Sequence, residues 1–345
     1  MGAGQSVFGP ALPAFARDLG LTVADAGWLI SALWVGCILG VACMFRYGTR
    51  ITPRVALLLM AAGAGFIASS PGWWGTIAGA LIFGAGYGSA TVVFNPRVLA
   101  AFGDTGPSML SLLNAVFSLG AIAAPLVFVS VGSQPNIMFG MIAVGCGVVC
   151  LFAGAAGRVK IAASAAAAPY KIHWGILFFG MIAVGMEACL IGLGPTALIK
   201  AGETEAQAAK LLSLFFVTFL AARIALVLAA RYVPSFTIFV MAIGGAAVLA
   251  IAAALVNPSM FFVIIGLSAG LFFPSFYVTA SRKMGTEPRV APTIIAAGLV
   301  GGIVSPVLMG AMMDSLGRFG FFWIIGGVTG LTTVSAMLVL RSMNK

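Results

Sequence analysis

Charged side chains are scarce in this chain: they make up 8% of its 345 residues, whereas a soluble domain carries roughly a quarter. Hydrophobic residues make up 61% and are gathered in long runs separated by short polar breaks. Such a composition excludes an ordinary soluble domain. It predicts an all-α polytopic membrane protein of the cell inner membrane, whose apolar runs are its spans.

Histidine and cysteine are also scarce, which limits the chemistry that the chain can support. The single histidine, His173, opens an apolar run beside Lys171 and Trp174. An interfacial anchor is expected there, with a proton relay as the alternative. Of the five cysteines, Cys146 and Cys150 share a helix face, but no histidine or carboxylate lies near them in the sequence. Such thiols are small apolar fillers more often than metal ligands.

Signatures of catalysis are missing as well. The sequence contains no recognisable Ser/His/Asp set, phosphate-binding glycine loop or metal-ligand cluster. We therefore expect neither an enzyme, nor a cofactor, nor a metal site.

Acidic residues are almost absent from the apolar runs. Seven of the eight lie in or beside the polar breaks, namely Asp18, Asp25, Asp104, Glu203, Glu205, Glu287 and Asp314. The eighth, Glu187, falls near the middle of the stretch 173–200, which is long enough to cross a bilayer. A charge at the midplane costs roughly 2.5 to 3.5 kcal/mol, so such residues usually face a protein interior or an aqueous cavity. Two interpretations stay open: a substrate or proton site, and a structural glutamate that is protonated or paired across helices.

Twelve apolar runs can be read along the chain, and the first is short. They cover residues 1–16, 24–45, 54–70, 73–96, 108–131, 135–157, 172–199, 207–230, 235–256, 258–281, 290–313 and 319–340. Thirteen basic residues lie in one alternate set of breaks and after the last run, and four lie in the other set. Because cytoplasmic loops carry the excess of Lys and Arg, this alternation predicts a multi-pass membrane protein with a cytoplasmic C-terminus. It also accounts for the net charge of +10 without a nucleic-acid partner.

An internal repeat divides the chain. The segment from Gly120 to Pro125 reads GAIAAP, and the segment from Gly301 to Pro306, 181 residues later, reads GGIVSP. The two prolines should each bend a span, because proline removes a backbone donor and clashes with the preceding turn. Their recurrence favours functional bends that gate the cycle, and we assign Gly120 and Gly301 to the same bends; the alternative is helix packing alone.

The near-constant offset predicts two homologous bundles of six spans. We expect the bundles at residues 1–157 and 172–345, joined by a short, basic, Ala-rich cytoplasmic linker at 158–171. Two such bundles, entering the membrane from the same side, form the parallel arrangement that rocks about a site near the midplane. The repeat therefore predicts a carrier.

Several short motifs point to a family. They are Gly185-Met186-Glu187 and Gly194-Pro195 in the seventh run, Ala222-Arg223 in the eighth, and Gly270-Leu271-Phe272-Phe273-Pro274 in the tenth. Together with the repeat, they resemble the major facilitator superfamily over essentially the whole chain. Within it, the nearest resemblance is to the fucose/glucose permease-like sugar symporters.

Two departures from the family pattern limit what the resemblance implies. The loop between the second and third spans normally carries an aspartate, but residues 45–57 contain no acid. The sugar symporters also place a carboxylate in the fourth span, where this chain reads Thr91 to Asn95. Any cytoplasmic latch must therefore differ, and that proton-coupling group is missing.

A short polar inventory remains inside the spans. Its members are Gln5, Asn95, Asn114, Glu187, Ser275 and Tyr277. Gln5 and Glu187 are equivalent in the repeat at an offset of 182. Amides, a carboxylate and aromatic rings suit polyols, which need paired donors and acceptors and offer apolar C–H faces. For Gln5 and Asn114 the alternative is interhelical hydrogen bonding. Arg223, about two turns from the cytoplasmic end of its span, is shallow enough to snorkel and is expected to be structural.

The resemblance implies a transporter of a small polar organic solute, a sugar or related polyol, working by alternating access, with Glu187 as the candidate proton-binding group. The expected partners are that solute, protons and the lipid bilayer, and the protein is expected to be a monomer. Two alternatives stay open: an exporter of lipophilic compounds or drugs, and a carrier-like sensor or assembly factor that no longer transports.

The short first run carries one more expectation. Subtracting 182 from the start of the seventh run places the equivalent start about ten residues before Met1. A helix over residues 1–15 would extend only roughly 22 Å, short of the approximately 30 Å hydrocarbon core. We therefore expect an incomplete first span from a misassigned start or a loss in the gene, with a tolerated short span as the alternative.

Overall fold

A computed structural model describes residues 1–47, 51–69, 72–102, 105–154, 171–229, 232–285 and 290–344. Within these ranges the chain forms helices joined by short turns and contains no strand, which confirms the all-α prediction there. The chain divides into two compact units, Met1–Ala163 and Ser164–Lys345. The predicted linker, 158–171, lies outside the described residues except for Lys171.

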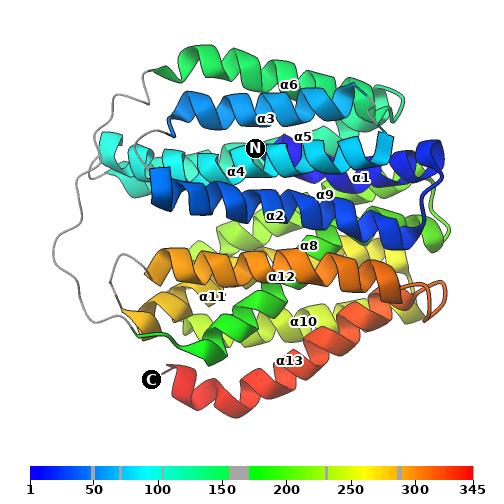
Figure 1. Cartoon of the computed structure of the whole chain (residues 1–345). Coiled ribbons are helices and arrows are strands. Elements are labelled where there is room, and N and C mark those ends of the chain that lie inside the picture. Colours follow the sequence, from blue (N-terminus) through cyan, green and yellow to red (C-terminus); the bar gives the residue numbers. More distant parts are fainter. Residues whose placement is uncertain are drawn as a thin grey trace. The chain divides into compact units, whose positions relative to one another are not determined.

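The helices follow the predicted apolar runs closely (Figure 1). Unit 1 contains α1 (Gly2–Leu19), α2 (Val23–Tyr47), α3 (Pro53–Ala68), α4 (Gly72–Phe102), α5 (Gly106–Ser130) and α6 (Pro135–Phe152). Unit 2 contains α8 (Trp174–Lys200), α9 (Glu205–Ala229), α10 (Ser235–Leu255), α11 (Pro258–Met284), α12 (Val290–Met312) and α13 (Gly320–Asn344). Each of these helices begins within two residues of the predicted start.

The end predicted for the fourth run was wrong. The run was expected to stop at residue 96, but α4 continues to Phe102. The apolar pattern ends at residue 96 because polar residues follow, but the backbone hydrogen bonds of a helix do not require apolar side chains. The Arg97 side chain supports this part of the helix, because its Nη1 donates to the Val93 carbonyl one turn earlier, at 2.8 Å.

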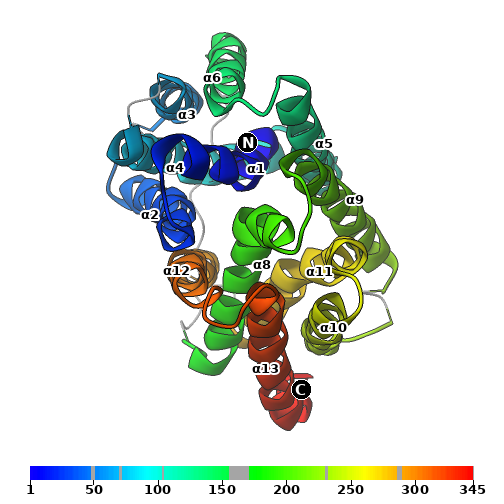
Figure 2. The ribbon, with the colours of Figure 1, turned by 90° about the vertical axis from the view of Figure 1, so that its right-hand side faces the viewer.

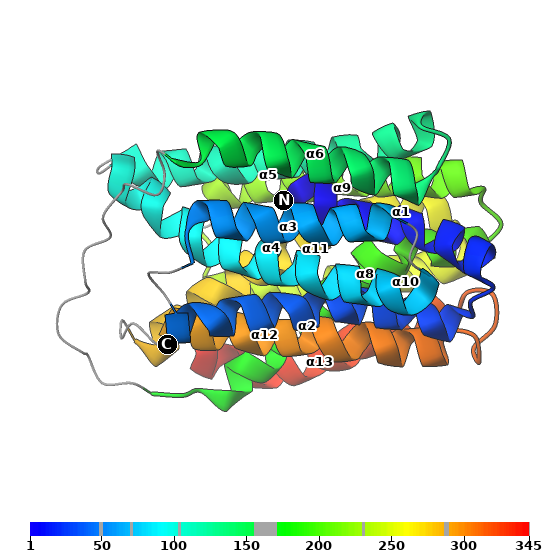
Figure 3. The ribbon, with the colours of Figure 1, turned by 45° about the horizontal axis from the view of Figure 1, so that its top comes forward.

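The same helix pairings occur in both units. In unit 1, α1 packs along α5, α2 along α4, and α3 along both α4 and α6. In unit 2, α8 packs along α12, α9 along α11, and α10 along both α11 and α13. Figure 2 shows α10 beside α11, and Figure 3 shows α3 between α4 and α6. Each helix of unit 2 thus has the partners that its counterpart has in unit 1.

Glycines bring the paired helices into backbone contact. A Cβ atom added to Gly84 of α4 would strike the Leu33 carbonyl oxygen of α2, and one added to Gly88 would strike that of Cys37. In unit 2, a Cβ atom on Gly270 of α11 would strike the Phe219 carbonyl oxygen of α9. Small residues at these positions therefore set the distance between the helices of each pair.

Most of the described helices can cross a bilayer. Nine of them are long and apolar enough by length and composition, namely α4, α5, α6 and α8 to α13; the apolar segments Gly27–Cys43 and Pro53–Ala68 are shorter. Several large apolar side chains are exposed, including Val144 and Leu151 of α6 and Val334 and Leu338 of α13. Such faces are suited to lipid rather than water, and the chain is a multi-pass membrane protein.

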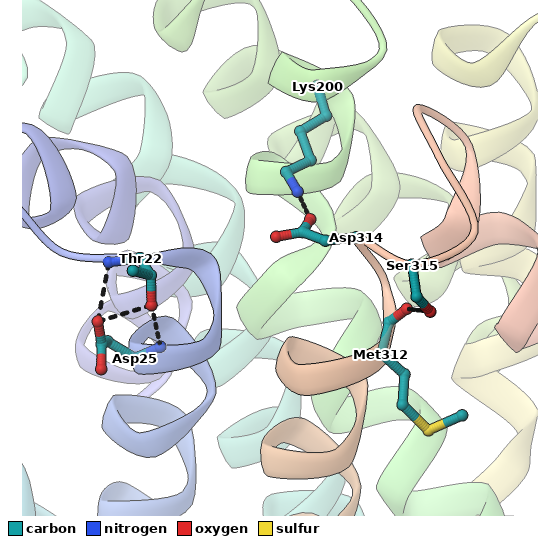
Figure 4. A network of polar contacts seen from close by, with 6 residues as sticks. All are labelled: Thr22, Asp25, Lys200, Met312, Asp314 and Ser315. Carbon is teal, nitrogen blue, oxygen red and sulfur yellow. Dashed lines mark hydrogen bonds and ion pairs between the residues drawn. The ribbon is translucent and has the colours of Figure 1, made fainter.

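Polar contacts hold several helix ends in place (Figure 4). In the first turn of α2, the Asp25 carboxylate accepts hydrogen bonds from the Thr22 backbone N–H at 2.8 Å and the Thr22 hydroxyl at 2.7 Å. In unit 2, Lys200 at the end of α8 forms an ion pair with Asp314, which follows α12. Just after Asp314, the Ser315 hydroxyl donates to the Met312 carbonyl at 2.7 Å. The end of α8 is therefore tied to the turn between α12 and α13.

Candidate functional site

Glu187 lies in the most deeply buried span. In the most apolar window of α8, 72% of the residues are buried, against 22% for α6. Glu187 stands thirteen residues from either end of α8. Its Oε2 atom is buried and, among the described residues, has no hydrogen-bond partner. Leaving a buried oxygen unpaired costs about 1 to 3 kcal/mol, and more if it is charged. The unpaired oxygen is therefore suited to reversible binding of a proton or of a polar group of a ligand.

Within the described ranges, the positive charge of Arg223 on α9 acts electrostatically on Glu187. The Nε atom of Arg223 donates to the Gly270 carbonyl of α11 at 3.4 Å. Its guanidinium lies 4.4 Å from the centre of the Phe219 ring, within the range of a cation–π contact. The arginine thus links α9 to α11 while its charge acts on α8.

The two predicted site residues of α11 differ in their burial and in the contacts of their side chains. Ser275 is buried, and its hydroxyl donates to the Leu271 and Phe272 carbonyls of its own helix. Tyr277 is half-buried, and its ring packs against that of Phe273 with the centres 5.6 Å apart. Among the described residues, neither side chain is hydrogen bonded to Glu187.

In unit 1, Gln5 has a partner that the sequence analysis missed. The Tyr87 hydroxyl of α4 donates to Gln5 Oε1 of α1 at 2.8 Å. The Trp34 ring of α2 meets the Tyr87 ring edge to face, with centres 6.5 Å apart and planes at 84°. The sequence did contain a pattern that could have pointed to Tyr87. Polar side chains recur every four residues along one face of α4, at Tyr87, Thr91 and Asn95.

The two predicted asparagines occupy different settings. Asn95 is half-buried on α4, two turns beyond Tyr87. Asn114 is exposed on α5, and its backbone carbonyl accepts a hydrogen bond from the Ser118 hydroxyl at 3.0 Å. Both lie on helices of unit 1, as Gln5 does.

The matched prolines and glycines occupy equivalent places in the two units. Pro125 is buried inside α5 and Pro306 is buried inside α12, and both helices continue through them. A Cβ atom on Gly120 would approach the Ala3 backbone nitrogen of α1 at 3.1 Å, and one on Gly301 would strike the Met181 carbonyl oxygen of α8. Helices α5 and α12 therefore each pack closely on the first helix of their own unit.

Metal ligation has no candidate in the parts of the chain that the structure describes: they hold no group of three or more His, Cys, Asp or Glu side chains placed to bind an ion.

Comparisons with known proteins agree with this architecture. The profile of the family described as Major Facilitator Superfamily matches residues 1–297. No curated protein matches the sequence. Solved structures that share the fold include the nucleoside transporter NupG, at 13% identity and a TM-score of 0.74, over 99% of this chain and 95% of that one. A variant of the Escherichia coli fucose:proton symporter FucP matches at 17% identity and a TM-score of 0.63, over 98% and 97% of the two chains. The D-xylose-proton symporter matches at 14% identity and a TM-score of 0.70, over 97% and 93%.

Proposed function

The chain belongs to the Major Facilitator Superfamily, and from this we propose that it is a secondary active transporter of a small polar organic solute, a sugar or related polyol. It works by alternating access, and protons bind at Glu187 during the cycle. The carboxyl oxygen of Glu187 carries the proposal, because it is buried at the centre of α8 without a partner among the described residues. An ionisable group in such a place is usually functional.

The proposed architecture is that of twelve spans in two bundles of six. The bundles comprise residues 1–157 and 172–345, the linker at 158–171 and the C-terminus are cytoplasmic, and the protein acts as a monomer. The recurrence of the helix pairings in units 1 and 2 supports this arrangement. The alternation of basic residues supports the orientation.

The solute is held by uncharged side chains within the spans of each unit. We assign solute contacts to Gln5, Asn95, Asn114, Ser275 and Tyr277, whose amides, hydroxyls and ring suit a polyol. Three solved proteins of the same fold are described as transporting a nucleoside, fucose or D-xylose. Their solutes share a hydroxylated ring, which supports this class of solute.

The remaining assigned residues serve the change between inward and outward forms or the packing of the helices. Pro125 and Pro306 bend α5 and α12, and Gly120 and Gly301 let each bend lie against the first helix of its unit. Arg223 is a structural charge that links α9 to α11 through the Gly270 carbonyl and packs on Phe219 of its own helix.

The decisive experiment measures uptake of a panel of labelled sugars and nucleosides into vesicles, with and without an imposed pH gradient. Wild-type protein should accumulate at least one solute only when the gradient is present. Glu187→Gln should abolish that accumulation and retain solute exchange, because glutamine keeps the hydrogen-bonding shape but carries no titrating proton.

Glu205→Gln is the matched control, since Glu205 begins α9 and stands outside the proposed site; it should accumulate solute as wild type does. Unchanged gradient-driven accumulation by Glu187→Gln would remove the coupling role. Inhibition by lipophilic compounds but by no sugar or nucleoside would replace the solute class with that of a lipophilic exporter.

A further inference from the structure

Pro274 interrupts the backbone hydrogen bonds of α11. A proline has no N–H, so Pro274 cannot donate to the carbonyl of Gly270 four residues earlier. The next carbonyl, that of Leu271, accepts a hydrogen bond from the Ser275 hydroxyl of the same helix. Gly270 is buried, and a buried carbonyl without a donor is costly. The Gly270 carbonyl therefore requires a donor from outside the backbone of α11.

Helix α9 supplies a donor through Arg223, whose Nε atom lies 3.4 Å from the Gly270 carbonyl oxygen. The helices come this close because Gly270 has no side chain: a Cβ atom there would strike the Phe219 carbonyl oxygen, one turn before Arg223. The ring of Phe219 also packs on the guanidinium. At 3.4 Å the hydrogen bond is longer than the roughly 2.9 Å of a typical N–H···O bond. It is therefore weak and can be exchanged for a stronger one.

Glu187 lies on the face of α8 that packs on α11. A Cβ atom added to Gly180 of α8 would strike the Phe276 ring of α11, and one added to Gly194 would strike the Phe262 ring. Glu187 is seven residues from each of these glycines. Because seven residues make about two helical turns, the Glu187 side chain shares their face and is directed toward α11.

The same two contacts give the depth of Glu187. The earlier glycine of α8 meets the later phenylalanine of α11, so the two helices run antiparallel. The position midway between the two phenylalanines is Ala269, which is buried and precedes Gly270. Glu187 therefore stands level with the carbonyl that Arg223 holds. In agreement with this placement, the positive charge of Arg223 acts electrostatically on Glu187.

Other titratable or charged groups on the helices packed against α8 lie away from this level. Helix α12 has none between Val290 and Met312. Besides Arg223, those on α9, α11 and α13 are Glu205, Lys210, Tyr277, Arg282, Lys283 and Arg341. The nearest to Gly270 along α11 is the phenol of Tyr277, roughly 10 Å away at 1.5 Å per residue, and Arg282 is roughly 18 Å away. Helix α8 itself adds Cys189 and, at its end, Lys200.

A carbonyl and a carboxylate thus compete for one guanidinium. A hydrogen bond from arginine to an ionised carboxylate is roughly twice as strong as one between neutral groups. While Glu187 carries a proton it is neutral, and the Gly270 carbonyl retains the guanidinium. Once the proton leaves, the carboxylate is the stronger acceptor.

We infer that Arg223 supplies from α9 the hydrogen bond that Pro274 removes from α11, and that ionisation of Glu187 withdraws it. Arg223 is then a positioning residue: α11 is held at Pro274 while Glu187 is protonated and can bend there after the proton leaves. The inference rests on the proposed function for the binding of protons at Glu187. It adds Pro274 as the point at which release of the proton changes a helix.

The first measurement is hydrogen–deuterium exchange over residues 270–280 of the purified protein in lipid nanodiscs, which reports local opening. Arg223→Met removes the guanidinium and should speed exchange about 2- to 10-fold, the loss expected for one hydrogen bond. In a Pro274→Ala background the restored backbone N–H bonds the Gly270 carbonyl, so Arg223→Met should have no effect. Lys210→Met is the matched control, since Lys210 is an exposed cation of the same helix; it should exchange as wild type does.

The second measurement compares wild type with Glu187→Gln at the same pH, so that the intrinsic exchange rate cancels. At about pH 5 the two should exchange alike over residues 270–280. At about pH 9 wild type should exchange faster, because glutamine cannot ionise and leaves the guanidinium on Gly270. Arg223→Met should exchange fast at both pH values.

An equal effect of Arg223→Met with and without Pro274→Ala would show that the arginine only packs, and would overturn the inference. Equal exchange of wild type and Glu187→Gln at both pH values also overturns it. If Arg223→Met does not fold, Pro274→Ala provides the test with the arginine in place. The difference between Glu187 and Glu187→Gln should then disappear in that background, and its persistence overturns the inference.

Failure of the proposed function would give a different pattern. If Glu187→Gln keeps gradient-driven accumulation in vesicles while the exchange results are as expected, the role of Glu187 in proton coupling is removed and the inference stands. If Glu187→Gln loses accumulation while the effects of Arg223→Met and Pro274→Ala are independent, the inference alone is removed.

Discussion

Two acidic residues in this chain lie in opposite surroundings. Asp25 stands at the exposed start of α2, where the Thr22 hydroxyl and backbone N–H both donate to its carboxylate. Glu187 stands at the centre of α8 with one buried oxygen that has no partner in the described residues. The first carboxylate is placed to stay ionised and secure a helix end. The second lies where, under the proposed function, a proton or a solute group binds.

The capping contact at Asp25 predicts a pH dependence. Hydrogen bonds from the Thr22 side chain and then its backbone lower the pKa of Asp25 below its usual value of 3.8. A group whose pKa is lower in the folded state stabilises that state above its unfolded pKa and loses this effect as the pH falls through the folded value. The contribution of Asp25 should therefore be complete at pH 6 and decline below about pH 4.

We expect Asp25→Asn to unfold at a temperature lower by no more than about 2 °C at pH 7, because one exposed cap contributes little. The difference from wild type should shrink toward zero at about pH 3. Thermal unfolding of the detergent-purified proteins at both pH values measures it. An equal difference at pH 3 and pH 7 would mean that the charge of Asp25 does not stabilise the helix end.

At the level of the helices, each unit repeats one packing scheme. The first and fifth helices of unit 1, α1 and α5, pack together as α8 and α12 do in unit 2. In both pairs a glycine of the second helix, α5 or α12, lies against the backbone of its partner. A proline inside such a helix cannot donate a backbone hydrogen bond, so the helix can bend there at low cost.

Replacing Pro125 or Pro306 by alanine tests whether these bends serve the transport cycle. Alanine restores a backbone donor, so insertion and folding should be nearly unchanged. Exchange of the inward and outward forms should slow, because a straighter helix resists the change. We expect turnover in vesicles to fall several-fold while the yield of folded protein and solute affinity stay near wild type. Wild-type turnover in both variants would show that the prolines serve packing alone.

For the whole molecule, the distribution of basic residues predicts the orientation in the membrane. Thirteen lie in breaks assigned to the cytoplasm and four lie in the opposite breaks. A fluorescent protein fused after Lys345 should fluoresce, and alkaline phosphatase fused there should be inactive, because that enzyme needs an oxidising compartment.

The matched control fuses the same reporters after Gly317, in the turn between α12 and α13. There the phosphatase should be active and the fluorescence absent. Phosphatase activity at both sites, or at Lys345 alone, would contradict the proposed orientation.

Local properties of the sequence were sufficient to predict where the helices begin. Because a span must bury its backbone polar groups within itself, an apolar run of about 20 residues has few other conformations in a bilayer. The predicted starts therefore agree with the observed ones to within two residues. The predicted end of the fourth run was wrong, because α4 extends beyond the apolar residues to Phe102. There the Arg97 side chain donates a hydrogen bond to the Val93 carbonyl.

The sequence by itself also singled out Glu187, since a lone acid in an apolar run is visible without a structure. It did not reveal the partner of Gln5, because Tyr87 lies 82 residues away on another helix. Nor did it reveal the hydrogen bond of Arg223 to the Gly270 carbonyl of α11, because the depth of Arg223 in its span had suggested only a snorkelling side chain. Hydrophobicity and charge along the chain determine which segments enter the membrane, whereas which polar side chains meet depends on how the helices rotate and pack. Only the tertiary structure decides that, because backbone contacts at glycines such as Gly88 set the distance and rotation of each pair.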